Sequence, residues 1–157
     1  MDIPVYLMTE PELAAEPALD IRPWGWDAAL RKRLSGLGVD ESLLPSMQQI
    51  SVWREYSHRS KSVSLLPELQ LNEHFCGESY YLKTPEEWKS FVEEREGCLL
   101  KAPLSGSGKG LNWCKGTFTP FISGWCTRVA ALQGGVIAEP IYNKVEDFAL
   151  EFYSDGA

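Results

Sequence analysis

The sequence predicts an α+β fold in which a helical N-terminal part, residues 1–77, precedes a small antiparallel sheet flanked by helices, residues 78–157. Three observations favour this fold. Amphipathic helix patterns dominate the first part, short apolar runs of strand length occur in the second, and clear helix-start signals lie between those runs. At 157 residues, with 44% hydrophobic residues, the chain is long enough for one domain with a core or for two small lobes.

Two helices are predicted in the N-terminal part. Asp27 is expected to cap the first, because leucines recur at helical spacing after it. The second helix starts at the Ser-Met-Gln-Gln segment of residues 46–49, which has the form of a capping box, and ends near Ser57. Strands are then predicted within residues 63–71 and 78–83.

In the C-terminal part, helices and strands are expected to alternate. Thr84 followed by Pro and two Glu residues predicts a helix start, and a buried strand follows at residues 99–101. Thr119 repeats the start signal for a longer helix, which leads to a strand at residues 136–139. The last predicted strand covers residues 148–153 and is antiparallel to the one before it.

Between the strand at 99–101 and the helix that follows lies a loop rich in Ser, Gly and Lys. Lys101 and Lys109 supply positive charge, and the glycines let backbone N–H groups approach an anion without a Cβ clash. The candidate backbone donors are Ser105, Gly106, Ser107, Gly108, Lys109 and Gly110. This composition is chemically suited to binding phosphate.

The common phosphate-loop motifs do not match this segment. A Walker A loop would need Gly at position 103 and Ser or Thr at position 110, where the chain has Pro103 and Gly110. A dinucleotide fingerprint would need Gly at position 111, which is Leu111. In protein kinases the conserved strand lysine follows the glycine loop, whereas Lys101 precedes it.

Composition excludes several function classes. The formal net charge is −7, from 15 basic and 22 acidic residues, which argues against a nucleic-acid binder with a basic face. No apolar run has the length of a membrane span and no secretion signal is recognisable, so we expect a cytoplasmic protein without a membrane partner. The four cysteines form no CxxC pair, which argues against a zinc site and favours buried, reduced thiols.

The order of strand lysine, Ser/Gly loop and a later strand ending in Glu139-Pro140 resembles the ATP-grasp family. Over residues 20–153, four segments more narrowly resemble an uncharacterised ATP-grasp-like group common in gut anaerobes. They are Pro23-Trp24-Gly25-Trp26-Asp27, Ser57-His58-Arg59, residues 101–108, and Glu139-Pro140 through Phe148 with Glu151-Phe152. The resemblance implies that residues 78–157 form the small nucleotide-binding lobe of that fold.

For the phosphates, the resemblance implies that Lys101 contacts the α- and β-groups and that residues 105–110 donate to the terminal ones. Arg59 would be a second phosphate contact, at a position where most of these proteins have lysine. A planar guanidinium also binds phosphate well. The alternative for Arg59 is an arginine on a solvated helix end.

For the nucleoside, the resemblance implies that Glu139 lies at the adenine amino group, with Ile141 and Tyr142 beside the ring. Pro140 cannot pair within a sheet, which leaves neighbouring main-chain groups free for the base. Asp147, with Glu146 as the alternative, would accept from the ribose hydroxyls. Whether the base is adenine or guanine stays open.

The reaction implied by the resemblance is ATP-dependent ligation. ATP phosphorylates a small-molecule or peptide carboxylate, an amine attacks the acylphosphate, and Mg²⁺ bridges the phosphates. The acidic and Asn ligands for Mg²⁺ are expected outside this chain, on a second lobe. The chain is therefore expected to be the ATP-binding part of a larger protein and incomplete for catalysis by itself.

Two other interpretations remain open. The first is a non-catalytic interaction domain on an ATP-grasp-like scaffold, in which some of the six tryptophans form an exposed contact surface. The second is an unrelated α+β domain in which residues 105–110 are a flexible connector.

Overall fold

The computed structural model describes residues 5–16, 20–74, 77–106 and 108–146. Within these ranges, six α-helices and a four-stranded antiparallel sheet confirm the predicted α+β fold. The chain divides into two compact units, Met1–His58 and Arg59–Ala157. The prediction placed the boundary after residue 77. Because the second unit begins at Arg59, the helix at Ser60–Leu69 belongs to that unit and not to the N-terminal helices.

The first unit is helical in its described residues. Its elements are α1 (Glu10–Ala15), α2 (Ala28–Gly36), a short 3-10 turn (Glu41–Leu43) and α3 (Met47–Tyr56). Asp27 caps α2 by accepting a hydrogen bond from the Leu30 N–H at 2.7 Å. Ser46 and Gln49 form the predicted capping box at the start of α3. Both predicted helices of this part are therefore confirmed.

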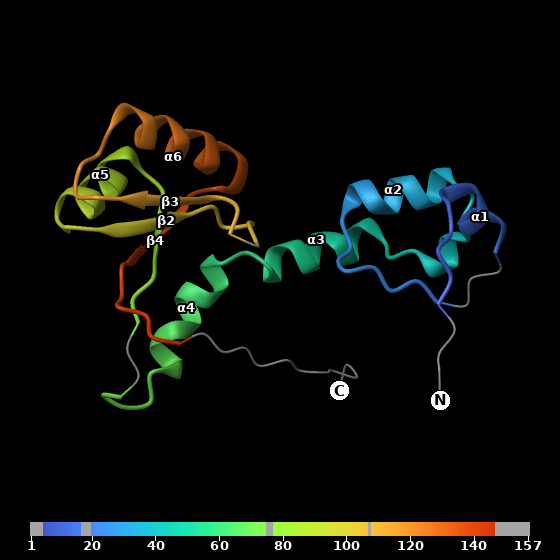
Figure 1. Ribbon diagram of the computed structural model, residues 1–157, viewed down its shortest axis with the longest axis horizontal. Helices are drawn as coiled ribbons and strands as arrows, with labels where there is room; N and C mark the ends of the chain where they lie inside the picture. The colour runs from blue at the N-terminus through green and yellow to red at the C-terminus, as the bar shows by residue number, and fades with distance from the viewer. Residues whose placement is uncertain (1–4, 17–19, 75–76, 107, 147–157) are drawn as a thin grey trace. The chain divides into compact units, whose positions relative to one another are not determined.

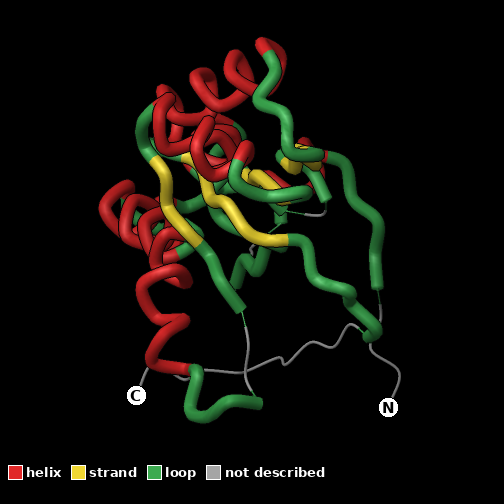
Figure 2. Tube along the Cα trace, turned by 90° about the vertical axis from the view of Figure 1, so that its left-hand side faces the viewer, coloured by secondary structure: helices red, strands yellow, loops and turns green. Residues whose placement is uncertain are grey.

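The second unit alternates helices and strands. Its elements are α4 (Ser60–Leu69), β1 (Tyr80–Leu82), α5 (Pro85–Glu93), β2 (Cys98–Lys101), β3 (Leu111–Cys114), α6 (Pro120–Gln133) and β4 (Val136–Pro140). The strands lie in the order β1-β4-β2-β3, and every neighbouring pair is antiparallel. They are the yellow segments of Figure 2. Because β4 is last in the chain but central in the sheet, the sheet is complete only when β4 inserts between β1 and β2.

The hydrophobic core lies between one face of the sheet and the helices α5 and α6. Figure 1 shows both helices on the same side of β2, β3 and β4. Alternation along the strands sends Leu100, Val136 and Ala138 to this side, where all three are fully buried. Trp88 and Val92 of α5 pack against them. Burial of this apolar surface is the main source of stability for the second unit.

Three of the cysteines lie in this core as free thiols. Cys98 and Cys114 face each other across the β2–β3 pair, and Cys126 comes from α6. Burial raises the pKa of the Cys126 thiol to about 12. A hydrogen bond to Cys98, with burial, also raises the pKa of Cys114. The same hydrogen bond lowers the pKa of Cys98. All three buried side chains pack as small hydrophobic groups, while Cys76 lies outside the described residues.

Two strand predictions need comment. The strand predicted within residues 63–71 is wrong, because this stretch is the helix α4. Its apolar side chains Val63 and Leu66 line one groove beside β1. Their spacing of three residues is typical of one face of a helix. The strand predicted within residues 78–83 is confirmed as β1. The strand β3 was not predicted. The strand predicted at residues 148–153 lies outside the described residues.

In the described residues, no helix combines the length and the apolar character that crossing a bilayer requires.

We expect Leu100→Ala to lower the free energy of unfolding by about 2–5 kcal/mol, because it leaves a cavity in a fully buried site. Leu132→Ala is the matched control, since Leu132 lies on α6 with 77% of its surface exposed. It should change stability by no more than about 0.5 kcal/mol. Urea unfolding followed by circular dichroism measures both variants. Equal effects would show that the sheet does not pack as described.

Candidate functional site

A cleft of about 380 Å³ lies on the sheet face opposite α5 and α6. Alternation along β2 explains its floor: Cys98 and Leu100 face the core, so Leu99 and Lys101 face the cleft. The lining residues are Arg59, Leu99, Lys101, Gly108, Lys109, Leu111, Trp113, Glu139, Pro140, Ile141, Tyr142 and Lys144. All of them belong to the second unit.

Strand register arranges the floor in rows. Leu99 stands opposite Trp113 on one side and opposite Glu139 on the other. Lys101 stands opposite Leu111 in the same way. Directly opposed residues of antiparallel strands share a face, so the three strands present one continuous surface. Trp113, on the edge strand β3, has 63% of its surface exposed and offers an aromatic face to a ligand.

Glycines shape the loop between β2 and β3. The Ala102 N–H donates to the Gly110 carbonyl at 2.8 Å and closes the loop. Gly110 has φ +68°, and a Cβ there would lie 2.7 Å from the Cβ of Ser105. Gly108 has φ +72° with open space around it. Gly110 is therefore required by backbone conformation and by space, whereas Gly108 is required by conformation alone.

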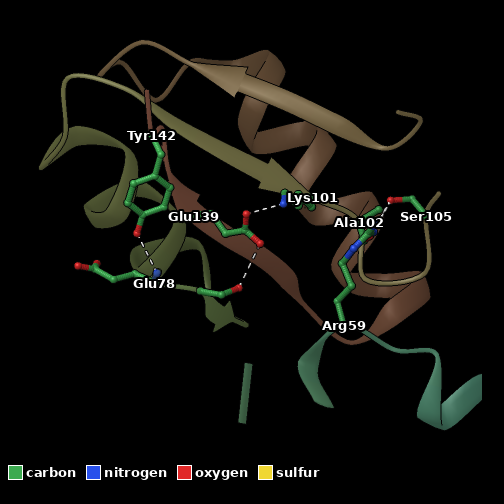
Figure 3. Close-up of polar contacts among 8 residues, drawn as sticks. Arg59, Glu78, Lys101, Ala102, Ser105, Glu139 and Tyr142 are labelled. Carbon is green, nitrogen blue, oxygen red and sulfur yellow. Dashed lines mark hydrogen bonds and ion pairs between the residues drawn. The ribbon is translucent and has the colours of Figure 1, made fainter. Parts of the chain in front are cut away.

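Arg59 anchors the base of this loop (Figure 3). Its Nη1 donates to the Ala102 carbonyl at 2.8 Å and to the Ser105 hydroxyl at 2.7 Å. Its backbone N–H donates to the Pro103 carbonyl at 3.2 Å. Arg59 is half-buried, so the alternative of a solvated helix end does not describe it. The hydrogen bonds hold the loop base against the start of α4.

Lys101 forms an ion pair with Glu139 across the cleft floor (Figure 3). The two side chains are only 22% and 26% exposed. The second carboxylate oxygen of Glu139 accepts a hydrogen bond from the Ser79 hydroxyl at 3.3 Å. Both oxygens of Glu139 are thus engaged by residues on neighbouring strands or at their ends.

The segment after β4 forms one wall of the cleft. Ile141 packs on Gly97, where a Cβ would lie 3.1 Å from the Ile141 Cδ1. The Tyr142 hydroxyl accepts a hydrogen bond from the Glu78 N–H at 2.8 Å, which ties this wall to the segment before β1 (Figure 3). Both side chains remain exposed enough to meet a ligand.

The cleft concentrates positive charge in an acidic protein. Four cationic side chains, those of Arg59, Lys101, Lys109 and Lys144, line it together with one carboxylate, that of Glu139. The whole chain has a formal net charge of −7. Local charge of the opposite sign to the protein's own favours an anionic ligand at this place.

The structure brings together seven of the twelve predicted site residues as cleft lining: Arg59, Lys101, Gly108, Lys109, Glu139, Ile141 and Tyr142. Ser105, Gly106 and Gly110 belong to the adjoining loop but do not line the cleft. Ser107 and Asp147 lie outside the described residues.

Five lining residues are not among the predicted site residues: Leu99, Leu111, Trp113, Pro140 and Lys144. Leu111 and Trp113 were missed because β3 was not predicted. The alternation of residues 111 and 113 next to the loop was the available signal, since a hairpin places them on the same face as Lys101.

The cleft does not fit a magnesium ion by itself. Among the residues that the structure describes, no group of three or more His, Cys, Asp or Glu side chains could hold a metal. Glu139, the carboxylate in the cleft lining, is paired with Lys101. Mg²⁺ requires a largely anionic oxygen environment, which these residues do not supply.

Comparison with known proteins adds no relative. No protein-family model, no curated protein and no solved structure matches this chain. The functional argument therefore depends on the cleft itself.

We expect Gly110→Ala to destabilise the second unit by about 1–3 kcal/mol, because it combines a positive φ with a clash against Ser105. Gly106→Ala, in the same loop, is the control: a Cβ there meets nothing within 4 Å. It should be neutral within about 0.5 kcal/mol. Thermal unfolding measures both. A neutral Gly110→Ala would mean that the loop is not closed as described.

Arg59→Met should loosen the loop without changing the sheet. Losing two hydrogen bonds from a cation should speed amide exchange at Lys109, whose N–H donates to the Gly106 carbonyl, by about tenfold. Arg128→Met, at an exposed arginine of α6, should leave this rate unchanged. Hydrogen exchange read by NMR gives the rates. The anchoring role is excluded if the two variants behave alike.

Proposed function

We propose that this chain is the nucleotide-binding part of an ATP-grasp ligase-like protein and that the cleft binds ATP. The observation that carries the proposal is the composition of the cleft: four cations and a glycine loop beside apolar and aromatic surface, in a protein of net charge −7. A polyphosphate joined to a planar base has these two chemical parts. The resemblance in motif order supports the same ligand.

The phosphates would lie toward the loop. Gly108 and Lys109 border the cleft there, and Lys101 is at the end of β2 beside them. Ammonium groups and backbone N–H groups are the usual partners of phosphate oxygens. Arg59 already uses one nitrogen, Nη1, to hold the loop base, so we assign it first to positioning the loop and second to the phosphates.

The base would lie toward the wall that follows β4. Leu99 and Ile141 supply apolar contact there, and Trp113 supplies an exposed ring across the floor. Stacking on an aromatic side chain is worth about 1–3 kcal/mol per base. Glu139 is the hydrogen-bond acceptor within reach of an amino group on the base, once it separates from Lys101.

In this proposal the reaction is carboxylate activation through an acylphosphate, followed by attack of an amine. The residues described here would bind and orient the nucleotide, while Mg²⁺ and the acceptor carboxylate would be held outside this chain. The cytoplasm, where ATP is available and the buried thiols stay reduced, is the expected location.

The alternative is a non-catalytic interaction domain on a similar scaffold. The observation that favours it is the exposure of Trp24 and Trp53 in the first unit, outside the cleft. It predicts a discrete oligomer or a protein complex and no response to nucleotide.

An amide NMR titration with MgATP separates the two proposals, because it detects binding even in the millimolar range. Shifts confined to residues 99–101, 108–111 and 139–144 are expected for nucleotide binding in the cleft. GTP in a parallel titration shows whether the base matters. A spectrum unchanged by nucleotide, together with self-association in sedimentation, would favour the interaction domain.

Lys101→Ala should weaken MgATP binding by about tenfold to a hundredfold, since it removes a charge-assisted contact to phosphate. Lys115→Ala is the control, because Lys115 is an exposed lysine just past β3 that does not line the cleft. It should bind as the parent protein does. Unchanged affinity in Lys101→Ala, with the fold intact by circular dichroism, would refute the proposed site.

A further inference from the structure

We propose that the Glu139 carboxylate competes with an anionic ligand for Lys101. As a result, the cleft binds a bare polyphosphate more weakly than a polyphosphate joined to a hydrogen-bond donor. The identity of the ligand in this inference rests on the proposed function. The competition itself rests on the ion pair between Lys101 and Glu139. It assigns to Glu139 a role in selecting the ligand, in addition to contact with the base.

The ion pair is built into the sheet. Lys101 stands opposite Ile137 and Leu99 stands opposite Glu139, so the two charged residues are diagonal neighbours on β2 and β4. Long side chains on one face reach each other across such a diagonal. Figure 3 shows the Lys101 side chain directed at Glu139. Neither partner depends on the conformation of the glycine loop.

The pair is also sheltered from water. The two side chains are 22% and 26% exposed, and the Ser79 hydroxyl holds the other carboxylate oxygen. A sheltered pair is screened less than one on the open surface, and separating it leaves each charge without its partner. An anion that binds Lys101 must therefore compensate for the loss of Glu139.

A bare polyphosphate compensates only half of this loss. It supplies negative charge to Lys101, but it leaves the Glu139 carboxylate unpaired and repels it across the same cleft. A ligand that also brings an N–H donor satisfies both partners at once. Replacing the carboxylate by a neutral amide, as in Glu139→Gln, would remove the competition and the repulsion together.

Inorganic tripolyphosphate, titrated against the full chain by isothermal calorimetry and amide NMR, tests the inference. We expect Glu139→Gln to tighten tripolyphosphate binding about threefold or more, as expected for removing a partly screened charge pair. Glu78→Gln is the matched control, because it changes net charge equally while the Glu78 carboxylate is bonded to the Tyr80 hydroxyl instead of Lys101. It should change the affinity less than twofold.

A double-mutant cycle confines the effect to the ion pair. In a Lys101→Ala background, Glu139→Gln should tighten tripolyphosphate less than it does in the parent protein, because only the direct repulsion remains to be removed. Glu139→Ala, which also removes the carboxylate, serves as the second variant if Glu139→Gln does not retain the parent circular dichroism spectrum. Preference for MgATP over tripolyphosphate should fall in either Glu139 variant.

The outcomes separate this inference from the proposed function. If the parent protein binds MgATP but Glu139→Gln does not tighten tripolyphosphate, the competition is wrong and the nucleotide site stands. If Glu139→Gln tightens tripolyphosphate but MgATP binds no better than tripolyphosphate to the parent protein, the competition stands as an anion effect and the nucleotide assignment fails. Binding of neither ligand to any variant overturns both.

Discussion

The pairing of β4 with β2 is the constraint on which the second unit depends. β4 is the last strand described, yet it lies between β1 and β2. Because side chains alternate along a strand, this one pairing sends Leu100 and Ala138 into the core and Lys101 and Glu139 into the cleft. A slip of one residue would exchange the two sets. The core and the candidate site are therefore fixed by the same register.

The loop after β2 owes its shape to contacts at its base. Arg59, the residue just before α4, holds Ala102 and Ser105, while Gly110 closes the other end. Anchoring both ends leaves the Gly108 and Lys109 segment beside the cleft. This division suits a phosphate-binding loop, since a fixed base lowers the entropy lost when the loop orders around a ligand.

Charge distribution gives the cleft its chemical character. Cations from the residue before α4, from β2, from the glycine loop and from the segment after β4 converge on it, although acidic residues outnumber basic ones in the chain. One carboxylate opposes them, and it holds the central lysine. The cleft therefore favours the approach of anions, while an anion that binds the central lysine competes with the carboxylate.

The sequence by itself determined the helices with strong caps and the strands at β2 and β4, because capping and periodicity are local properties. It placed Lys101, the glycine loop and Glu139 in one site only through the resemblance to the ATP-grasp family. The sequence pattern predicted a strand within residues 63–71, where the structure has α4, and it did not predict β3. Short apolar runs take their conformation from the elements they pack against. Only the tertiary structure decided that Trp113, Lys144 and Arg59 meet at one cleft and that Lys101 pairs with Glu139. Those contacts join strands and loops that are distant in the chain, and they form only once β4 has paired with β2 and the loops have packed around the sheet.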